Sequence, residues 1–141
     1  HFATLAQQLA AAGYAIWLFG SPKDHAVAEE IAQLAPDLCR NLCGATSLVQ
    51  AVDLLAMAEL VVCNDSGLMH VAAALDRPIV ALYGSSSPGF TPPLSDRADI
   101  LSLNLDCSPC FKRECPLGHL DCLNKLQPEQ VFAACQQRMA P

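Results

Sequence analysis

Hydrophobic residues along the chain alternate between helix-like spacing and short continuous runs. Apolar residues that recur every three or four positions predict helices over residues 2–12, 22–34, 47–58, 65–75 and 128–138. Continuous apolar runs predict strands buried on both faces over residues 14–19, 60–63 and 78–83, and shorter strands are expected at 39–43 and 99–103. Because strands and helices alternate with short links, the pattern predicts a Rossmann-like, doubly wound parallel α/β sheet.

Composition narrows the class of protein without changing this fold. The 141 residues amount to one domain, and 52% of them are hydrophobic, which excludes a disordered, coiled-coil or collagen-like chain. The formal net charge of −6 argues against binding a nucleic acid through its backbone. No apolar stretch approaches the roughly 20 residues of a membrane span, and no signal peptide is visible. The chain starts with His1 rather than Met, so we expect it to be part of a longer protein.

Ligands of open parallel sheets bind beyond the carboxyl ends of the strands, where the predicted fold has three turns. These turns are residues 20–25, 64–67 and 84–87. None of them carries a G-x-G-x-x-G, Walker A or G-x-S-x-G pattern. The usual signatures of dinucleotide binding, nucleoside-triphosphate binding and serine hydrolysis are therefore absent.

The turn at residues 64–67 has the strongest chemical content. Asp65 follows a predicted strand directly and is a natural N-cap for the next helix. Gly67 costs that helix up to ~1 kcal/mol relative to alanine, but together with Ser66 it leaves N-terminal N–H groups uncovered for an anion. Helical side chains lean toward the N-terminus, so the imidazole of His70 should cover the same opening. A capped helix with a packed histidine is the alternative.

The first turn shares this geometry with weaker chemistry. Ser21 is placed to cap the following helix, and Lys23, Asp24 and His25 can reach a ligand or solvent. A solvated loop is the simpler interpretation. Residues 44–48 likewise read as a loop and a helix cap, although they also lie at the carboxyl end of a predicted strand.

The eight cysteines fall into two groups. Four lie in apolar segments and are predicted to be small buried side chains: Cys39, Cys43, Cys63 and Cys135. The other four, spaced C-x2-C-x4-C-x6-C, define the four-cysteine segment (residues 107–122): Cys107, Cys110, Cys115 and Cys122. Four thiolates suit zinc or an iron–sulfur cluster, yet the spacing matches neither the two-knuckle zinc pattern nor a ferredoxin run. A structural metal, packed reduced thiols and disulfides all remain open, although cytosolic reducing conditions weigh against stable disulfides.

Three stretches of the sequence resemble one enzyme family. They are NDSGLMHVAAAL at residues 64–75, PIVALYGSSSPGFTPP at 78–93 and CSPCFKRECPLGHLDC at 107–122. In combination they are similar to ADP-heptose:lipopolysaccharide heptosyltransferases of glycosyltransferase family 9, and the four-cysteine segment looks most like that of the heptosyltransferase II group. The resemblance covers essentially the whole chain, but only the carboxyl-terminal half of such an enzyme.

The resemblance implies a GT-B glycosyltransferase, in which two Rossmann-like domains face each other across a cleft. Residues 1–141 would be the domain that binds the donor ADP-heptose, while the N-terminal domain, with the acceptor site and the catalytic base, would be absent from this chain. The implied reaction is inverting transfer of L-glycero-D-manno-heptose to the inner core of lipopolysaccharide, by a cytoplasmic enzyme peripheral to the inner membrane. We expect no cofactor, no catalytic metal and no turnover by this chain alone. A non-catalytic nucleotide-binding or regulatory α/β module is the alternative.

The resemblance also implies roles for individual residues. Asp65 would contact the donor sugar, the backbone of Ser66 and Gly67 would hold the diphosphate, and His70 would support the phosphate or the sugar. The residues expected around the adenosine are Thr46 and Leu48 at the adenine and the turn of Gly20, Ser21 and Asp24 near the ribose. Oriented N–H dipoles, rather than net charge, would let an acidic domain hold ADP.

Overall fold

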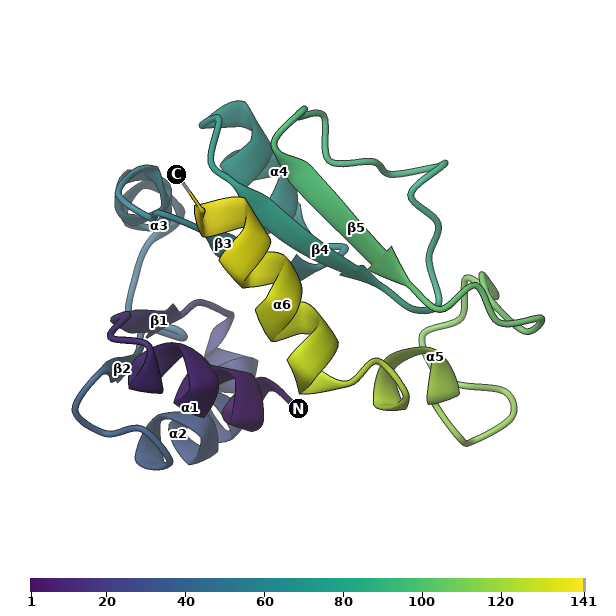
Figure 1. Ribbon diagram of the computed structural model, residues 1–141, viewed down its shortest axis with the longest axis horizontal. Helices are drawn as coiled ribbons and strands as arrows, with labels where there is room; N and C mark the ends of the chain where they lie inside the picture. Colours follow the sequence, from purple (N-terminus) through teal and green to yellow (C-terminus); the bar gives the residue numbers. More distant parts are fainter. Residues whose placement is uncertain (141) are drawn as a thin grey trace. The chain divides into compact units, whose positions relative to one another are not determined.

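Two compact units make up the computed structural model, which describes residues 1–140 (Figure 1). The first unit comprises His1–Asp53 and the second Leu54–Pro141. Each unit contains its own parallel sheet, with strand order β1-β2 in the first and β3-β4-β5 in the second. The predicted parallel α/β fold is therefore confirmed, and it is described below one unit at a time.

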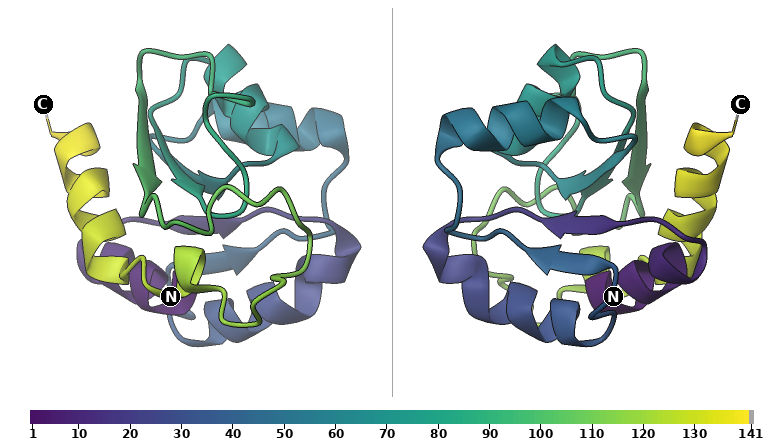
Figure 2. Two further views of the ribbon diagram at one scale, coloured as in Figure 1. Left: turned by 90° about the vertical axis from the view of Figure 1, so that its right-hand side faces the viewer. Right: turned by 90° about the vertical axis from the view of Figure 1, so that its left-hand side faces the viewer.

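The first unit packs two helices on two short strands. Its elements are α1 (Phe2–Ala11), β1 (Ile16–Leu18), the 3-10 helix η1 (Pro22–Asp24), α2 (His25–Gln33) and β2 (Cys39–Asn41). The helices α1 and α2 contact each other, and each also contacts one of the strands (Figure 2). The apolar side chains buried in this unit include Leu5, Ala6, Ala28, Ala32 and Cys39. The α1 helix agrees with the predicted one at 2–12 to within one residue.

The strand β1 is shorter and less buried than its apolar run predicts. Its ladder with β2 contains three residue pairs, so Tyr14 and Phe19 have no partner strand. Trp17 is 37% exposed, and β1 pairs with a single strand, β2. The predicted strand at residues 14–19, buried on both faces, is thus wrong in length and in burial. The predicted helix at residues 22–34 is also divided, since it opens as η1 and continues as α2.

The second unit has the doubly wound arrangement that the sequence predicts. Its elements are β3 (Val61–Asn64), α4 (Gly67–Ala74), β4 (Ile79–Tyr83), β5 (Ala98–Ser102), α5 (Asp121–Asn124) and α6 (Pro128–Met139). The helix α3 (Leu48–Ala56) spans the boundary between the two units. The strand β4 lies between β3 and β5, and α4 and α6 cover opposite faces of this sheet (Figure 1 and Figure 2).

Burial in the second unit is concentrated on the central strand. Every residue of β4 is buried, as its continuous apolar run predicts. Its largest fully buried side chains are Tyr83, Met69, Ile79, Val80 and Cys135, and full burial of an apolar side chain contributes ~1.5–3 kcal/mol. The guanidinium of Arg138 fastens α6 to β5, because its Nε–H donates to the Asp99 carboxylate at 2.9 Å.

The remaining predictions differ from the structure by small amounts. The strand predicted at residues 99–103 is β5, displaced by one residue, and the last helix extends to Met139. The helix α5 was not predicted, because four residues are too few to show a helical period. None of the helices in residues 1–140 has the length and apolar character needed to cross a membrane.

Candidate functional site

The carboxyl end of β3 leads directly into the N-terminus of α4. Ser66 is the N-cap residue, with extended backbone angles (φ −153°, ψ 165°), and the helix begins at Gly67. The prediction that Asp65 caps this helix is therefore wrong by one residue. The Ser66 side chain makes no capping hydrogen bond, so the first N–H groups of α4 remain free of a side-chain partner at the cap.

Gly67 leaves the space in front of this helix end open. A Cβ atom added to Gly67 would have no heavy atom within 4 Å, and the residue is exposed. The prediction that this glycine uncovers the helix N-terminus is confirmed. Unpaired N–H groups and the partial positive charge of about +0.5 at a helix N-terminus together favour an anion.

The Asp65 carboxylate is held by a residue from a distant loop. The Thr91 hydroxyl donates to Oδ2 of Asp65 at 2.8 Å, and the Thr91 carbonyl accepts a hydrogen bond of 2.6 Å from the hydroxyl of Tyr83. Tyr83 is fully buried at the end of β4. These contacts fix the side chain that the sequence placed at the donor sugar, and they explain why Asp65 does not cap α4.

Thr91 is a site residue that the sequence analysis missed. It is 26 positions away from Asp65, in a loop for which hydrophobic periodicity gives no signal. One available signal was Tyr83 itself, because a tyrosine in a fully apolar strand needs a partner for its hydroxyl. The loop that follows β4 is the nearest segment that can supply one.

Burial keeps two neighbouring groups of this site protonated. The pKa of the Tyr83 hydroxyl is raised, mainly by burial and then by the charge of Asp65. The pKa of the Cys63 thiol is raised to about 12 by burial, with Asp65 adding to the effect. At neutral pH both groups are therefore neutral, and Tyr83 acts as a hydrogen-bond donor.

His70 lies one helical turn beyond Ser66, and it is exposed. The preceding residue, Met69, is fully buried beneath the helix and lies 3.5 Å from the Tyr83 hydroxyl through its sulfur. The structure thus brings Asp65, the open N-terminus of α4 and the exposed His70 together at one end of the second unit. Across residues 1–140, no three His, Cys, Asp or Glu side chains are arranged to hold a metal ion.

The predicted adenosine residues gather in the first unit. The N–H and the hydroxyl of Ser21 both donate to Oδ2 of Asp24, at 2.8 and 2.6 Å. These hydrogen bonds lower the pKa of Asp24. Ser21 is also the N-cap of η1, with Pro22 at the first helical position, as predicted.

The turn at residues 20–24 lies beside the loop that follows β2. The Gly44 N–H donates to the Gly20 carbonyl at 3.1 Å, and a Cβ added to Gly44 would lie 2.9 Å from the Cα of Pro22. Gly44 also has a φ of +71°, which favours glycine. This loop continues through the half-buried Thr46 to Leu48, which is 69% exposed at the start of α3. Two adjoining segments of the first unit therefore contain Gly20, Ser21, Asp24, Thr46 and Leu48.

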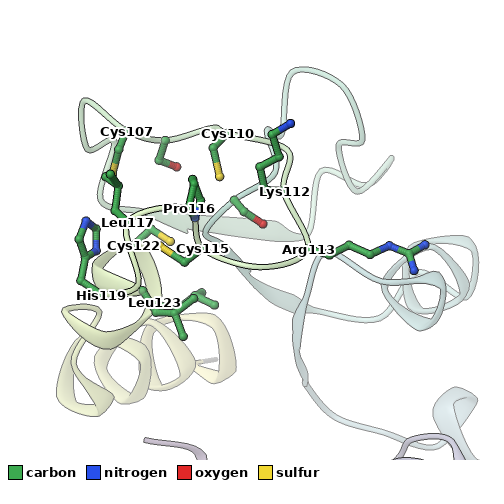
Figure 3. Close-up of a pocket in the computed structure, with 13 residues that line it drawn as sticks. Cys107, Cys110, Lys112, Arg113, Cys115, Pro116, Leu117, His119, Cys122 and Leu123 are labelled. Atoms are coloured by element: carbon green, nitrogen blue, oxygen red, sulfur yellow. The ribbon is translucent and has the colours of Figure 1, made fainter.

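The cysteines follow the predicted division into two groups. Cys39, Cys43 and Cys135 are buried, whereas Cys63 is only partly so. All eight are free thiols. The four cysteines of the four-cysteine segment line a single cavity next to α5 (Figure 3).

Thiol acidity differs within the four-cysteine segment. The backbone N–H of Leu120, and then those of Leu117, Gly118 and His119, lower the pKa of Cys115. Burial, followed by the neighbouring thiols, raises the pKa of Cys122.

A doubly wound parallel sheet with an uncovered helix N-terminus at a strand end defines an open α/β domain of the Rossmann-like class. The model of glycosyltransferase family 9 (heptosyltransferase) matches residues 1–121. The chain belongs to this family.

Relatives of known sequence and structure agree with this assignment. Lipooligosaccharide heptosyltransferase 2 of Haemophilus influenzae is 56% identical over 107 residues, which is 73% of this chain and 31% of the relative. Lipopolysaccharide heptosyltransferase 2 of Salmonella typhimurium is 50% identical over 136 residues, or 94% of this chain and 39% of the relative. The predicted likeness to the heptosyltransferase II group is confirmed.

Two solved structures are similar over nearly the whole chain. The structure of Escherichia coli ADP-heptose lipopolysaccharide heptosyltransferase II matches with a TM-score of 0.83 and 44% identity, over 99% of this chain and 40% of that one. The E. coli heptosyltransferase WaaC with ADP matches with a TM-score of 0.76 and 27% identity, over 98% and 38%. The chain thus spans about 40% of the length of these proteins.

Proposed function

We propose that this chain is the donor-binding part of a heptosyltransferase. The whole enzyme would transfer L-glycero-D-manno-heptose from ADP-heptose to the inner core of lipopolysaccharide, in the cytoplasm and at the inner membrane surface. The observation that carries this proposal is the open N-terminus of α4 beside Asp65, in a chain that belongs to a heptosyltransferase family. A relative of known structure, with 27% identity, is described with ADP.

The donor diphosphate would lie at the N-terminus of α4. The N–H groups after Ser66 have no side-chain cap, and the side chain that would cover them is missing at Gly67. Backbone dipoles hold an anion without requiring a positive domain, which fits a chain with a net charge of −6. The exposed His70 would reach the same phosphates or the sugar.

The same groups would assist the departure of ADP. As the bond between heptose and diphosphate breaks, negative charge grows on the leaving phosphate oxygens, and fixed N–H donors stabilise that charge without reorganising. Asp65, held by Thr91 at 2.8 Å, would position a hydroxyl of the donor sugar. The loops at Gly20–Asp24 and Thr46–Leu48 would contact the adenosine.

The catalytic base and the acceptor site would belong to the part of the enzyme that this chain does not span. A chain that holds only the donor can bind ADP-heptose, but it lacks the group that removes a proton from the acceptor hydroxyl. We therefore expect no turnover when this chain is mixed with ADP-heptose and acceptor. Product formation by the isolated chain would contradict this division of roles.

Calorimetry with ADP and ADP-heptose tests the proposal. We expect His70→Ala to weaken binding of both ligands by about tenfold, which corresponds to one lost hydrogen bond of ~1.4 kcal/mol. Asp65→Ala should weaken the binding of ADP-heptose more than the binding of ADP, because the proposed partner of Asp65 is the sugar.

Asp96→Ala is a matched control for Asp65→Ala. Asp96 is an exposed carboxylate that precedes β5, whereas Asp65 follows β3. Because the strands are parallel, Asp65 lies at the carboxyl ends of the strands and Asp96 lies at their amino ends. Equal affinities of all three variants and the unchanged chain for both ligands would refute the proposed site and favour a module with another function.

A further inference from the structure

Two exposed phenylalanines meet outside the hydrophobic core of the second unit. The rings of Phe90 and Phe111 contact each other edge-on, with centroids 5.3 Å apart and an interplanar angle of 68°. Phe90 is 81% exposed and Phe111 is 56% exposed, so neither ring belongs to the core. Phe90 lies in the loop that follows β4, whereas Phe111 lies in the four-cysteine segment. These two residues, the aromatic pair, therefore join two loops that are distant in the sequence.

Backbone contacts hold Phe111 at the end of β4. Its N–H donates to the Ser85 carbonyl at 2.7 Å, and the hydroxyl of Ser108, three residues earlier, donates to the Gly84 carbonyl. Phe111 also has a φ of +55°, a left-handed conformation that is uncommon for a bulky residue and persists only where surrounding contacts determine it. Because Gly84 and Ser85 directly follow the fully buried β4, Phe111 is the fixed half of the aromatic pair.

The other half of the aromatic pair is next to the residue that holds Asp65. The N–H groups of Phe90 and Thr91 both donate to the Ser87 carbonyl, at 3.0 and 3.2 Å, and so close one turn. From this turn the Thr91 hydroxyl donates to Oδ2 of Asp65 at 2.8 Å. Thr91 is itself exposed, so hydrogen bonds and the neighbouring ring, rather than packing in the core, set the position of its hydroxyl. A shift of Phe90 would therefore alter the hydrogen bond to Asp65.

We propose that Phe111 is a positioning residue for the donor sugar. Through the aromatic pair it fixes the turn that contains Thr91, and it thereby holds Asp65 in the orientation that binds the sugar. This inference rests on the proposed role of Asp65 in donor binding. The contact between two such rings is equivalent to about a 2- to 10-fold change in an equilibrium constant. Donor affinity should depend on it by a similar factor, since affinity falls in proportion to the population of the binding-competent loop.

Binding of ADP-heptose and of ADP distinguishes this role from a general effect on folding. Phe111→Asn removes the ring, and asparagine adopts the left-handed backbone more readily than most residues. In calorimetry this variant should bind ADP-heptose about 2- to 10-fold more weakly and ADP with unchanged affinity, because only the sugar is proposed to contact Asp65. Phe111→Tyr retains the ring and should restore the affinity. Leu117→Ala, which removes a side chain that is 62% exposed in the same segment, is the matched control and should change neither affinity.

A double-mutant cycle tests whether the effect passes through Phe90. Phe90→Leu should weaken ADP-heptose binding as much as Phe111→Asn does, and the double variant should be no weaker than either single variant, because each change removes the same contact. Amide hydrogen exchange gives a readout without any ligand. The N–H groups of Phe90 and Thr91 should exchange faster in the Phe111→Asn variant, whereas those of β4 should exchange at the unchanged rate.

The outcomes separate this inference from the proposed function. If Asp65→Ala weakens ADP-heptose binding but Phe111→Asn does not, Phe111 has no positioning role and the proposed function stands. Equal losses of ADP and ADP-heptose affinity in Phe111→Asn, or additive effects of the Phe90 and Phe111 variants, would also overturn the inference, because the ring would then act by another route. If Asp65→Ala changes the binding of neither ligand, the inference and the proposed function are both wrong.

Discussion

Replacing Gly67 with alanine separates the folding of α4 from its proposed role in binding the diphosphate. The added Cβ would meet no heavy atom within 4 Å, and Gly67 does not have the left-handed backbone that would strain an alanine. Alanine is also the better helix former, by up to about 1 kcal/mol. The free energy of unfolding should therefore stay unchanged or rise by as much as ~1 kcal/mol.

The same methyl group would occupy the space in front of the N–H groups that are proposed to hold ADP. A hydrogen bond to a charged phosphate contributes ~1.5–3 kcal/mol. Each such bond that the methyl group displaces should raise the Kd for ADP by about 10- to 150-fold. The structure thus predicts a variant that is at least as stable as the unchanged chain but binds ADP far more weakly.

Calorimetry and chemical denaturation measure these two effects on the same preparation. Adenosine is the matched ligand control, since it lacks the phosphates and should bind the variant and the unchanged chain equally. If Gly67→Ala folds normally and binds ADP as well as before, the diphosphate does not lie at the N-terminus of α4. An equal loss of adenosine and ADP affinity would also refute the reasoning, because it would place the damage elsewhere.

Four further predictions test neighbouring contacts. Tyr83→Phe should lower the free energy of unfolding by ~0.5–1.5 kcal/mol in urea titration, because it removes the hydroxyl that donates to the Thr91 carbonyl at 2.6 Å. Thr91→Val should weaken ADP-heptose binding by about tenfold in calorimetry by releasing Asp65, and Thr91→Ser should restore it. The pKa of Asp24 is lowered from 3.8, so its carboxylate stabilises the fold above that pH, and this stabilisation is lost as the pH falls through the lowered pKa. In acid titration of the free energy of unfolding, the Asp24→Asn variant should therefore lose less stability than the unchanged chain. A pKa of about 12, against an ordinary 9.0, makes the Cys63 thiolate about 1000-fold rarer at neutral pH, which should appear as slow alkylation in mass spectrometry.

The sequence was most informative where one physical effect dominates. The strand β4 has no polar residue before its terminal tyrosine, and burial on both faces of a central parallel strand is the arrangement that such a run favours. The open N-terminus at Gly67 was also predictable, because glycine there weakens the helix and contributes nothing to a cap. In both cases the deciding residues are neighbours in the sequence.

The sequence was misleading where distant residues compete. Asp65 is a good N-cap by type and position, yet its carboxylate binds Thr91, whose approach depends on the buried hydroxyl of Tyr83. The run at residues 14–19 has the same apolar character as β4, but β1 pairs with one strand only, whereas β4 lies between two strands and contacts both α4 and α6. Local sequence propensity predicts neither the hydrogen bond between Asp65 and Thr91 nor the elements that pack beside residues 14–19.

One loop connects the proposed donor site with the four-cysteine segment. It follows β4 and contains both Phe90, whose ring meets that of Phe111 edge-on at 5.3 Å, and the adjacent Thr91, which holds Asp65. Phe111 also anchors the segment through its N–H on Ser85 at 2.7 Å. Ordering of the four-cysteine segment would therefore also restrain the loop that positions Asp65. Because coupling between two sites is reciprocal, donor binding at Asp65 would in turn order the segment, and the segment would act on the donor without contacting it.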